Sequence, residues 1–352
     1  MRSLYIASTE SSGGKTTLSI GLALALRRRG LAVGYFKPLG NASGTGHVAA
    51  DDDAVFVADV LGLAEAPSDL CPVLLDEGAV HDVLSGSDVD AMARVQETYE
   101  RVRQGKDVVV CEGLGEIWQG RFLRTSGSDL VRELDLRCLL AARFAGARLL
   151  DDVCYVKDAL KRRLLGVVFT IVPESRASLV KGEYAGFLAA NGVHTYGMLA
   201  AHGRLAAVTV GEIVLALGGT WVCGEEHADA LVESYLIGAM SPEHALRYFQ
   251  DTPDKVVVVG GDRAEIVLAA LETPTAAVVL TGSYVPSATV LGRAEELGVP
   301  IISVAGDTVS AADGIRRLFG RLGTHDRRKV DLVAELVEEH VDVDRLIADL
   351  KD

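Results

Sequence analysis

The sequence predicts an α/β protein in which a parallel sheet carries helices on both faces, followed by a smaller α/β unit. Aliphatic runs recur at 108–110, 256–259 and 276–280, and such runs are typical of strands buried on both faces of a parallel sheet. The stretches between strands are long enough for crossover helices. Hydrophobic residues make up 49% and aromatic residues only 5% of the 352 residues, so we expect an ordered core of mainly aliphatic side chains.

The first part of the chain begins with a βαβ pattern. A strand over 4–8, a loop, a helix over about 16–29 and a strand over 32–36 are expected to start the parallel sheet. Further strands are predicted over 108–111, 136–141, 164–171 and 195–198, and a helix over 209–217.

The pattern of strands and helices starts again after residue 224. Helices are predicted over 228–239, from Ser241 with Pro242 in the first turn, and over 262–271 and 287–297. The predicted strands cover 255–259, 276–280 and 300–304. An amphipathic stretch over 327–350 is expected to pack on the domain or on a partner subunit. We therefore predict two domains, 1–224 and 225–352.

Charge and composition exclude several kinds of partner. Lys plus Arg number 35 against 49 Asp plus Glu, and this net charge of −14 argues against nucleic acid, whose phosphates need a basic surface. No apolar run reaches the ~18 residues of a membrane span, so no membrane partner is expected. The five cysteines are scattered without a C-x-x-C spacing, which favours reduced thiols and a cytoplasmic protein.

A candidate phosphate-binding loop lies between the first strand and the first helix. Backbone N–H groups and a helix N-terminus in such a loop bind phosphate, Lys15 would reach the outer phosphates and Thr16 would bind magnesium. Thr9 stands where the usual motif has its first glycine. The residues predicted to bind the nucleotide are Thr9, Glu10, Ser11, Ser12, Gly13, Gly14, Lys15, Thr16 and Thr17.

Further polar residues follow the ends of two other predicted strands. Lys37 comes before Pro38 after the second strand, and it is expected to lie near Lys15, so that two cations face a polyphosphate or a nascent acyl phosphate. Lys15 and Lys37 are therefore the candidate catalytic residues. Glu112 ends another strand, where its carboxylate could hold magnesium, and residues 51–53 place three aspartates at a helix start.

These residues resemble a known family. The order 9–16, then Phe36-Lys37-Pro38, then Asp53, then Glu112-Gly113 resembles dethiobiotin synthetase and its relatives, which have a P-loop NTPase fold. With residues 4–10 and 34–38, the first domain looks like the amino-terminal region of long phosphate acetyltransferases. The resemblance implies ATP as cofactor, with GTP also compatible, Mg²⁺ held by Thr16, Asp53 and Glu112, and Lys37 on the nascent anion.

The second domain resembles the DRTGG domain that follows this region in those enzymes. The similar segments are 238–249, Gly260-Gly261-Asp262-Arg263 and Leu280-Thr281-Gly282, with Ser283 in place of the usual second glycine. Asp262 and Arg263 could bind a small anion, but we favour Asp262 as a helix N-cap and Arg263 as an ion pair at a subunit contact. The base-reading Asn typical of dethiobiotin synthetase is absent from 169–173.

Two classes of function agree with these residues. The first is a nucleotide- or metabolite-responsive regulatory module of the phosphate acetyltransferase type, with weak ATP hydrolysis and without the acetyltransferase domain. The alternative is an ATP-dependent ligase that phosphorylates a carboxylate or carbamate. The expected partners are a nucleotide, a small carboxylic acid or acyl phosphate, further copies of the chain in a homo-oligomer, and an enzyme of acetate or acyl-CoA metabolism.

Overall fold

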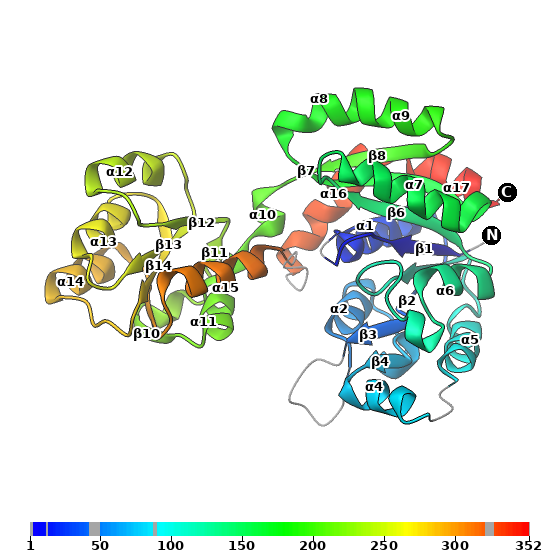
Figure 1. Ribbon diagram of the computed structural model, residues 1–352, viewed down its shortest axis with the longest axis horizontal. Helices are drawn as coiled ribbons and strands as arrows, with labels where there is room; N and C mark the ends of the chain where they lie inside the picture. The colour runs from blue at the N-terminus through cyan, green and yellow to red at the C-terminus, as the bar shows by residue number, and fades with distance from the viewer. Residues whose placement is uncertain (1–2, 12, 42–49, 87–89, 321–326, 352) are drawn as a thin grey trace. The chain divides into compact units, whose positions relative to one another are not determined.

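Aliphatic strands between residues 4 and 200 form one six-stranded parallel sheet (Figure 1). The computed structural model describes residues 3–11, 13–41, 50–86, 90–320 and 327–351. In sheet order the strands are β2 (Val33–Phe36), β5 (Val108–Glu112), β1 (Leu4–Ala7), β6 (Arg137–Arg143), β7 (Leu164–Val172) and β8 (His194–Ala200). A small parallel pair consists of β3 (Leu39–Asn41) and β4 (Val73–Leu75). The predicted α/β class with a parallel sheet is confirmed.

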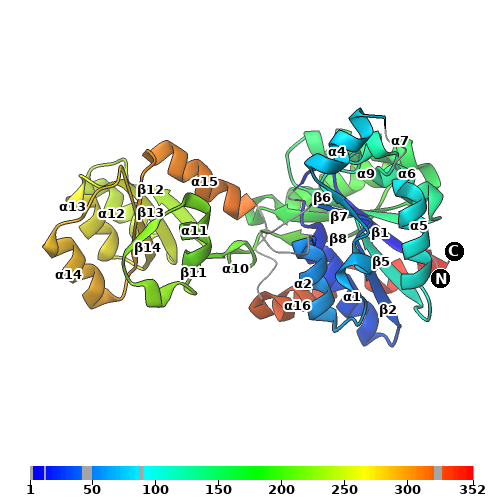
Figure 2. The same cartoon turned by 90° about the horizontal axis from the view of Figure 1, so that it is seen from below.

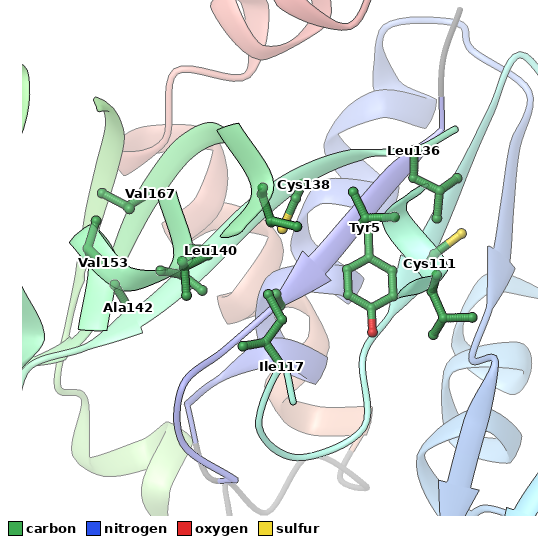
Figure 3. Close-up of a cluster of buried hydrophobic side chains, with 14 of the residues drawn as sticks. Tyr5, Cys111, Ile117, Leu136, Cys138, Leu140, Ala142, Val153 and Val167 are labelled. Carbon is green, nitrogen blue, oxygen red and sulfur yellow. The ribbon is translucent and has the colours of Figure 1, made fainter. Parts of the chain in front are cut away.

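Helices cover both faces of this sheet. Alternate strand residues such as Tyr5, Cys111 and Leu140 belong to a core shared with α5, α6 and α7, part of which Figure 3 shows. The opposite face carries α1, and α16 lies beside it (Figure 2). The helices of this unit are α1 (Lys15–Arg28), α2 (Asp52–Leu61), α3 (Pro67–Leu70), α4 (Glu77–Leu84), α5 (Ala91–Val102), α6 (Gly127–Glu133), α7 (Arg148–Leu160), α8 (Ala177–Leu179), α9 (Ala185–Ala190), α16 (Val330–His340) and α17 (Val343–Lys351).

The second unit has its own five-stranded sheet, parallel except for its first strand. The strands are, in sheet order, β10 (Thr220–Cys223), β15 (Ile301–Val304), β14 (Thr275–Thr281), β13 (Lys255–Gly260) and β12 (Ser234–Ile237). Helices α12 (Pro242–Gln250), α13 (Ala264–Leu271) and α14 (Ala288–Leu297) pack on one face. Helices α11 (Val210–Leu217) and α15 (Thr308–Gly320) pack on the other. Shorter elements are α10 (Gly203–Ala206), β9 (Val208–Thr209) and β11 (Leu231–Val232).

The units of the structure differ from the predicted domains 1–224 and 225–352. One unit comprises Met1–Ala201 with Thr324–Asp352, and the other comprises His202–Gly323. Residues 202–224 belong to the second unit because β10 pairs with β15 and α11 packs against α15. The carboxyl-terminal helices belong to the first unit because α16 packs so closely on α1 that a Cβ on Gly21 would lie 2.4 Å from Val337.

One predicted helix is wrong. Residues 228–239 form β11 and β12 in place of a helix. The segment pairs with β9 through Val232 and with β13 through residues 234–237, and the β-branched and aromatic side chains in it suit a strand. Pairing with distant strands therefore outweighed the local pattern.

Two predicted helix caps also differ. Arg263, not Asp262, occupies the N-cap position of α13, and its guanidinium donates to the carbonyls of Gly238 and Met240 at 2.9 Å each, within the unit. Ser241 does precede α12, but its hydroxyl contacts His244 Nδ1 at 2.9 Å and makes no capping bond to the backbone.

Candidate functional site

The loop between β1 and α1 owes its shape to two glycines. Gly14 is the N-cap of α1 with φ of 80°, a left-handed conformation that glycine adopts without strain. A Cβ on Gly13 would lie 1.9 Å from Ser8 Oγ, so a side chain at this position would collide with the residue that directly follows β1. The loop therefore leads closely from β1 into the amino-terminal end of α1, where the helix dipole favours anions.

Lys15 is buried at the start of α1. Its ammonium donates a 2.7 Å hydrogen bond to the carbonyl of Gly115. Longer bonds of 3.3 and 3.4 Å run to the carbonyls of Ser11 and Glu10. Burial lowers the pKa of Lys15 to about 8, and the nearby charge of Lys37 acts in the same direction. The lysine expected on the outer phosphates therefore bonds to main-chain oxygens of two loops.

Glu112 lies at the carboxyl end of β5 and is almost fully buried. Its Oε1 accepts a 2.6 Å hydrogen bond from the hydroxyl of Thr16, and its Oε2 accepts one from Tyr35 at 3.0 Å. Burial raises the pKa of this carboxyl, and the charge of Lys37 opposes that effect. The structure thus brings together two of the three predicted magnesium ligands.

Lys37 lies among three carboxylates. Its Nζ is 2.5 Å from Asp53 Oδ2, 2.8 Å from Asp51 Oδ1 and 4.0 Å from Glu112 Oε1. Burial alone would lower the pKa of Lys37, but these carboxylates raise it above its usual value, so the ammonium stays charged. The structure therefore differs from the expected pair of cations facing a ligand, because acids balance Lys37. Asp53, the third predicted magnesium ligand, contacts this lysine.

Asp51 is a site residue that the sequence analysis named only within the aspartate run 51–53, from which it chose Asp53 as the magnesium ligand. It is buried, its Oδ1 accepts the N–H of Ala54 at the start of α2, and its Oδ2 accepts the N–H of Asn41 in β3, both at 3.0 Å. Asp51 therefore connects Lys37 to two backbone elements. The run of three aspartates was the available signal, but it does not tell which carboxylate turns inward.

The loop after β5 contacts the phosphate loop at further points. The Ser11 hydroxyl donates to Glu116 Oε1 at 2.9 Å, and the N–H of Ile117 donates to the carbonyl of Ser8 at 2.8 Å. These bonds join two segments about 100 residues apart in the chain.

The other predicted nucleotide-binding residues have different environments. Glu10 lies 3.7 Å from Arg143 at the end of β6, so its carboxylate faces a cation. Thr9 and Thr17 are buried. Ser12 lies outside the described residues.

Thr16 and Glu112 fit a magnesium ion that binds together with a phosphate ligand. Among the residues that the structure describes, no three His, Cys, Asp or Glu side chains are grouped to hold a metal ion. Mg²⁺ prefers oxygen donors and commonly takes only one or two protein ligands, with phosphate oxygens and water completing its shell. The touching hydroxyl and carboxylate of Thr16 and Glu112 supply such donors.

Two known protein families match successive parts of the chain. The family described as an AAA domain matches residues 2–213, more than half of the chain. The chain belongs to this family. The DRTGG domain family matches residues 212–318 behind the AAA domain. The resemblance to a P-loop domain followed by a DRTGG domain is thereby confirmed.

The chain is similar over nearly its whole length to curated phosphate acetyltransferases. The one from Nitratidesulfovibrio vulgaris is 25% identical over 372 residues, which cover 97% of this chain and 51% of the relative. The one from Deinococcus radiodurans is 24% identical over 374 residues, which cover 100% of this chain and 51% of the relative. The chain therefore spans about half the length of the curated relatives it matches.

Solved structures show weaker likeness. The CBS and DRTGG domains of the regulatory region of Clostridium perfringens pyrophosphatase are 21% identical with a TM-score of 0.29, covering 34% of this chain and 48% of that chain. The signal recognition particle receptor FtsY from Elizabethkingia anophelis is 15% identical with a TM-score of 0.38, covering 56% of this chain and 58% of that chain.

Within the described ranges, no helix combines the length and the apolar character needed to cross a bilayer.

Proposed function

We propose that the AAA domain binds a magnesium-bound nucleoside triphosphate, ATP or GTP, and that the chain is a nucleotide-responsive regulatory module. The observation that carries this proposal is the convergence of Lys15, Thr16 and Glu112 beside the amino-terminal end of α1. A cation, a hydroxyl and a carboxylate at this place are the groups that a magnesium-triphosphate requires.

Each residue has a distinct role in this proposal. Lys15 exchanges its main-chain carbonyl partners for the outer phosphate oxygens, while Thr16 and Glu112 hold the magnesium ion. The ion neutralises negative charge on the phosphates when it is bound. The backbone N–H groups of the loop and the dipole of α1 bind the phosphates closer to the sugar.

The state of Lys37 favours regulation over synthesis. A ligase would need this lysine for its acid substrate, whereas here Asp51 and Asp53 contact its ammonium at 2.8 and 2.5 Å. We propose that nucleotide binding changes how the chain assembles with further copies or with an enzyme of acetate or acyl-CoA metabolism, with weak ATP hydrolysis at most. The likeness to phosphate acetyltransferases supports this direction.

A ligase is the second candidate because Lys37 lies 4.0 Å from the same Glu112 oxygen that Thr16 contacts. In that reaction a carboxylate oxygen held by Lys37 bonds to the γ-phosphorus. The bond from that phosphorus to the bridging oxygen breaks, and ADP leaves with the electron pair. The acid substrate would take the place of Asp53 on Lys37.

Calorimetric titration with Mg-ATP and Mg-GTP tests the binding proposal. We expect wild type to bind both nucleotides and Lys15→Ala to lose this binding. The control is Lys181→Ala, which changes an exposed lysine elsewhere in the unit and should bind as wild type does. Equal affinity in Lys15→Ala, or no binding by wild type, would contradict the proposal. ADP release that rises on addition of small carboxylic acids would favour the ligase.

A further inference from the structure

The phosphate loop is bonded to a strand that is not the neighbour of β1. The hydroxyl of Thr170, on β7, donates a 2.7 Å hydrogen bond to the carbonyl of Gly13, and both residues are buried. In the sheet, β6 lies between β1 and β7. The loop therefore crosses the carboxyl end of β6 and reaches β7, 157 residues away in the sequence.

This bond fixes the orientation of one peptide group in the loop. A trans peptide is planar, and its carbonyl and N–H point to opposite sides. With its carbonyl bonded to Thr170, the peptide between Gly13 and Gly14 directs the Gly14 N–H away from β7. Glycine has no Cβ to restrict rotation, so a bond from outside the loop restricts the orientation of two successive glycines further. Gly14 is also the N-cap of α1, where N–H groups bind anions.

Thr170 is itself held firmly. The carbonyl of Thr170 accepts the N–H of Phe144, next to the end of β6, at 3.0 Å. Directly after it, Ile171 has φ of 52° and the pairing of β7 with β8 shifts. The left-handed backbone at Ile171 interrupts the pairing of β7 with β8, which resumes at Val172 and Ala200, and the Thr170 hydroxyl bonds to the loop.

We infer that Thr170 is a positioning residue of the nucleotide site, which orients the Gly13–Gly14 peptide for phosphate and does not read the base. This inference rests on the proposed nucleotide binding. Its consequence is specific, because loss of the hydroxyl weakens the binding of every ligand that carries the same phosphates. The loss is independent of whether the base is adenine, guanine or absent.

The test compares Thr170→Val, which keeps the shape and removes the hydroxyl, with Thr170→Ser, which keeps the hydroxyl. Calorimetry would measure binding of Mg-ATP, Mg-GTP and Mg-tripolyphosphate. We expect Thr170→Val to weaken all three by about tenfold, the effect of one buried hydrogen bond, and Thr170→Ser to restore most of the affinity. The control is Thr275→Val in the second unit, which should bind as wild type does. The Thr275 hydroxyl also donates a 2.7 Å hydrogen bond to a carbonyl oxygen, in this case that of Ala270.

Several results would overturn the inference. Wild-type affinity in Thr170→Val, or a change only in the ratio of ATP to GTP affinity, would exclude the positioning role. If Thr170→Val does not fold, Thr170→Ala compared with Thr170→Ser gives the same contrast, and equal affinities would exclude the role. If wild type does not bind nucleotide, both the proposed function and this inference are overturned. If wild type binds tightly and Thr170→Val binds equally tightly, only the inference is overturned.

Discussion

Lys15 donates a 2.7 Å hydrogen bond to the carbonyl of Gly115, three residues beyond Glu112. One of the bonds that join the phosphate loop to the loop after β5 thus comes from a side chain that a triphosphate would draw away. If Lys15 moves to the phosphates, the Gly115 carbonyl loses this partner, and one of the bonds that hold the segment to the phosphate loop is broken. Nucleotide binding and the conformation of residues 113–118 should therefore be coupled.

Trp118 should report this coupling. The chain has two tryptophans, so Trp221→Phe leaves Trp118, which is about half exposed, as the only indole. We expect its fluorescence to change saturably on addition of Mg-ATP, with the same midpoint as calorimetric binding. Adding Lys15→Ala should abolish the response. Calorimetric binding with constant fluorescence would contradict the coupling.

Replacing Lys37 should destabilise the protein. Lys37→Met leaves Asp51, Asp53 and Glu112 close together without their cation, and breaking a buried ion pair in this way costs about 3 kcal/mol or more. Urea unfolding would measure the loss, and Lys181→Met serves as the exposed control. The double variant with Asp53→Asn should recover part of the stability because one of the repelling charges is gone. A loss below about 1 kcal/mol would show that the cluster does not depend on this lysine.

Nucleotide affinity should fall above about pH 8. Burial lowers the pKa of Lys15 to about 8, so the free protein loses this charge as the pH rises through that value. Phosphate binds the charged form, so binding above that pH takes up a proton and weakens by up to about tenfold per pH unit. Calorimetry between about pH 7 and 9.5, in two buffers of different ionisation enthalpy, would detect both effects. Lys255→Met, which removes another lysine with a pKa of about 8, should keep this dependence. A constant affinity would contradict the role of Lys15.

Lys255 should make stability depend on pH. Its buried ammonium donates to Thr273 Oγ1 and to the carbonyl of Pro274 at 2.9 Å each, and burial lowers its pKa from 10.5 to about 8. Between these values the unfolded chain binds more protons than the folded one, so stability rises with pH. Wild type should gain about 2 to 3 kcal/mol relative to Lys255→Met over this range, as measured by urea unfolding. A constant difference between the two proteins would exclude the shift.

Most of the fold was predictable because its signals are local. Aliphatic runs marked β5, β13 and β14, and the Gly14-Lys15 pair between a strand and a helix marked the phosphate loop. The prediction failed at residues 228–239, where the local pattern suited a helix but pairing with β9 and β13 decided the outcome. Strand pairing depends on partners far along the chain, and a local pattern contains no information about them.

The site was predictable in its residues but not in its contacts. The ends of parallel strands meet at one edge, so the approach of Lys15, Lys37 and Glu112 followed from the sequence. The position of Asp51 did not, because adjacent aspartates differ only in the direction of their side chains. That direction depends on how α2 packs and on the N–H of Asn41.

By itself the sequence determined the α/β class, the phosphate loop, the order of the two family domains and the identity of the charged residues at the strand ends. Tertiary structure decided that carboxylates balance Lys37, that Lys15 bonds to Gly115, that Thr170 holds Gly13 and that α16 packs on α1. The physical reason is distance along the chain. The contacts of Lys15 and Thr170 join residues 100 and 157 positions apart, and only packing of the whole sheet and its helices brings such groups within hydrogen-bond reach.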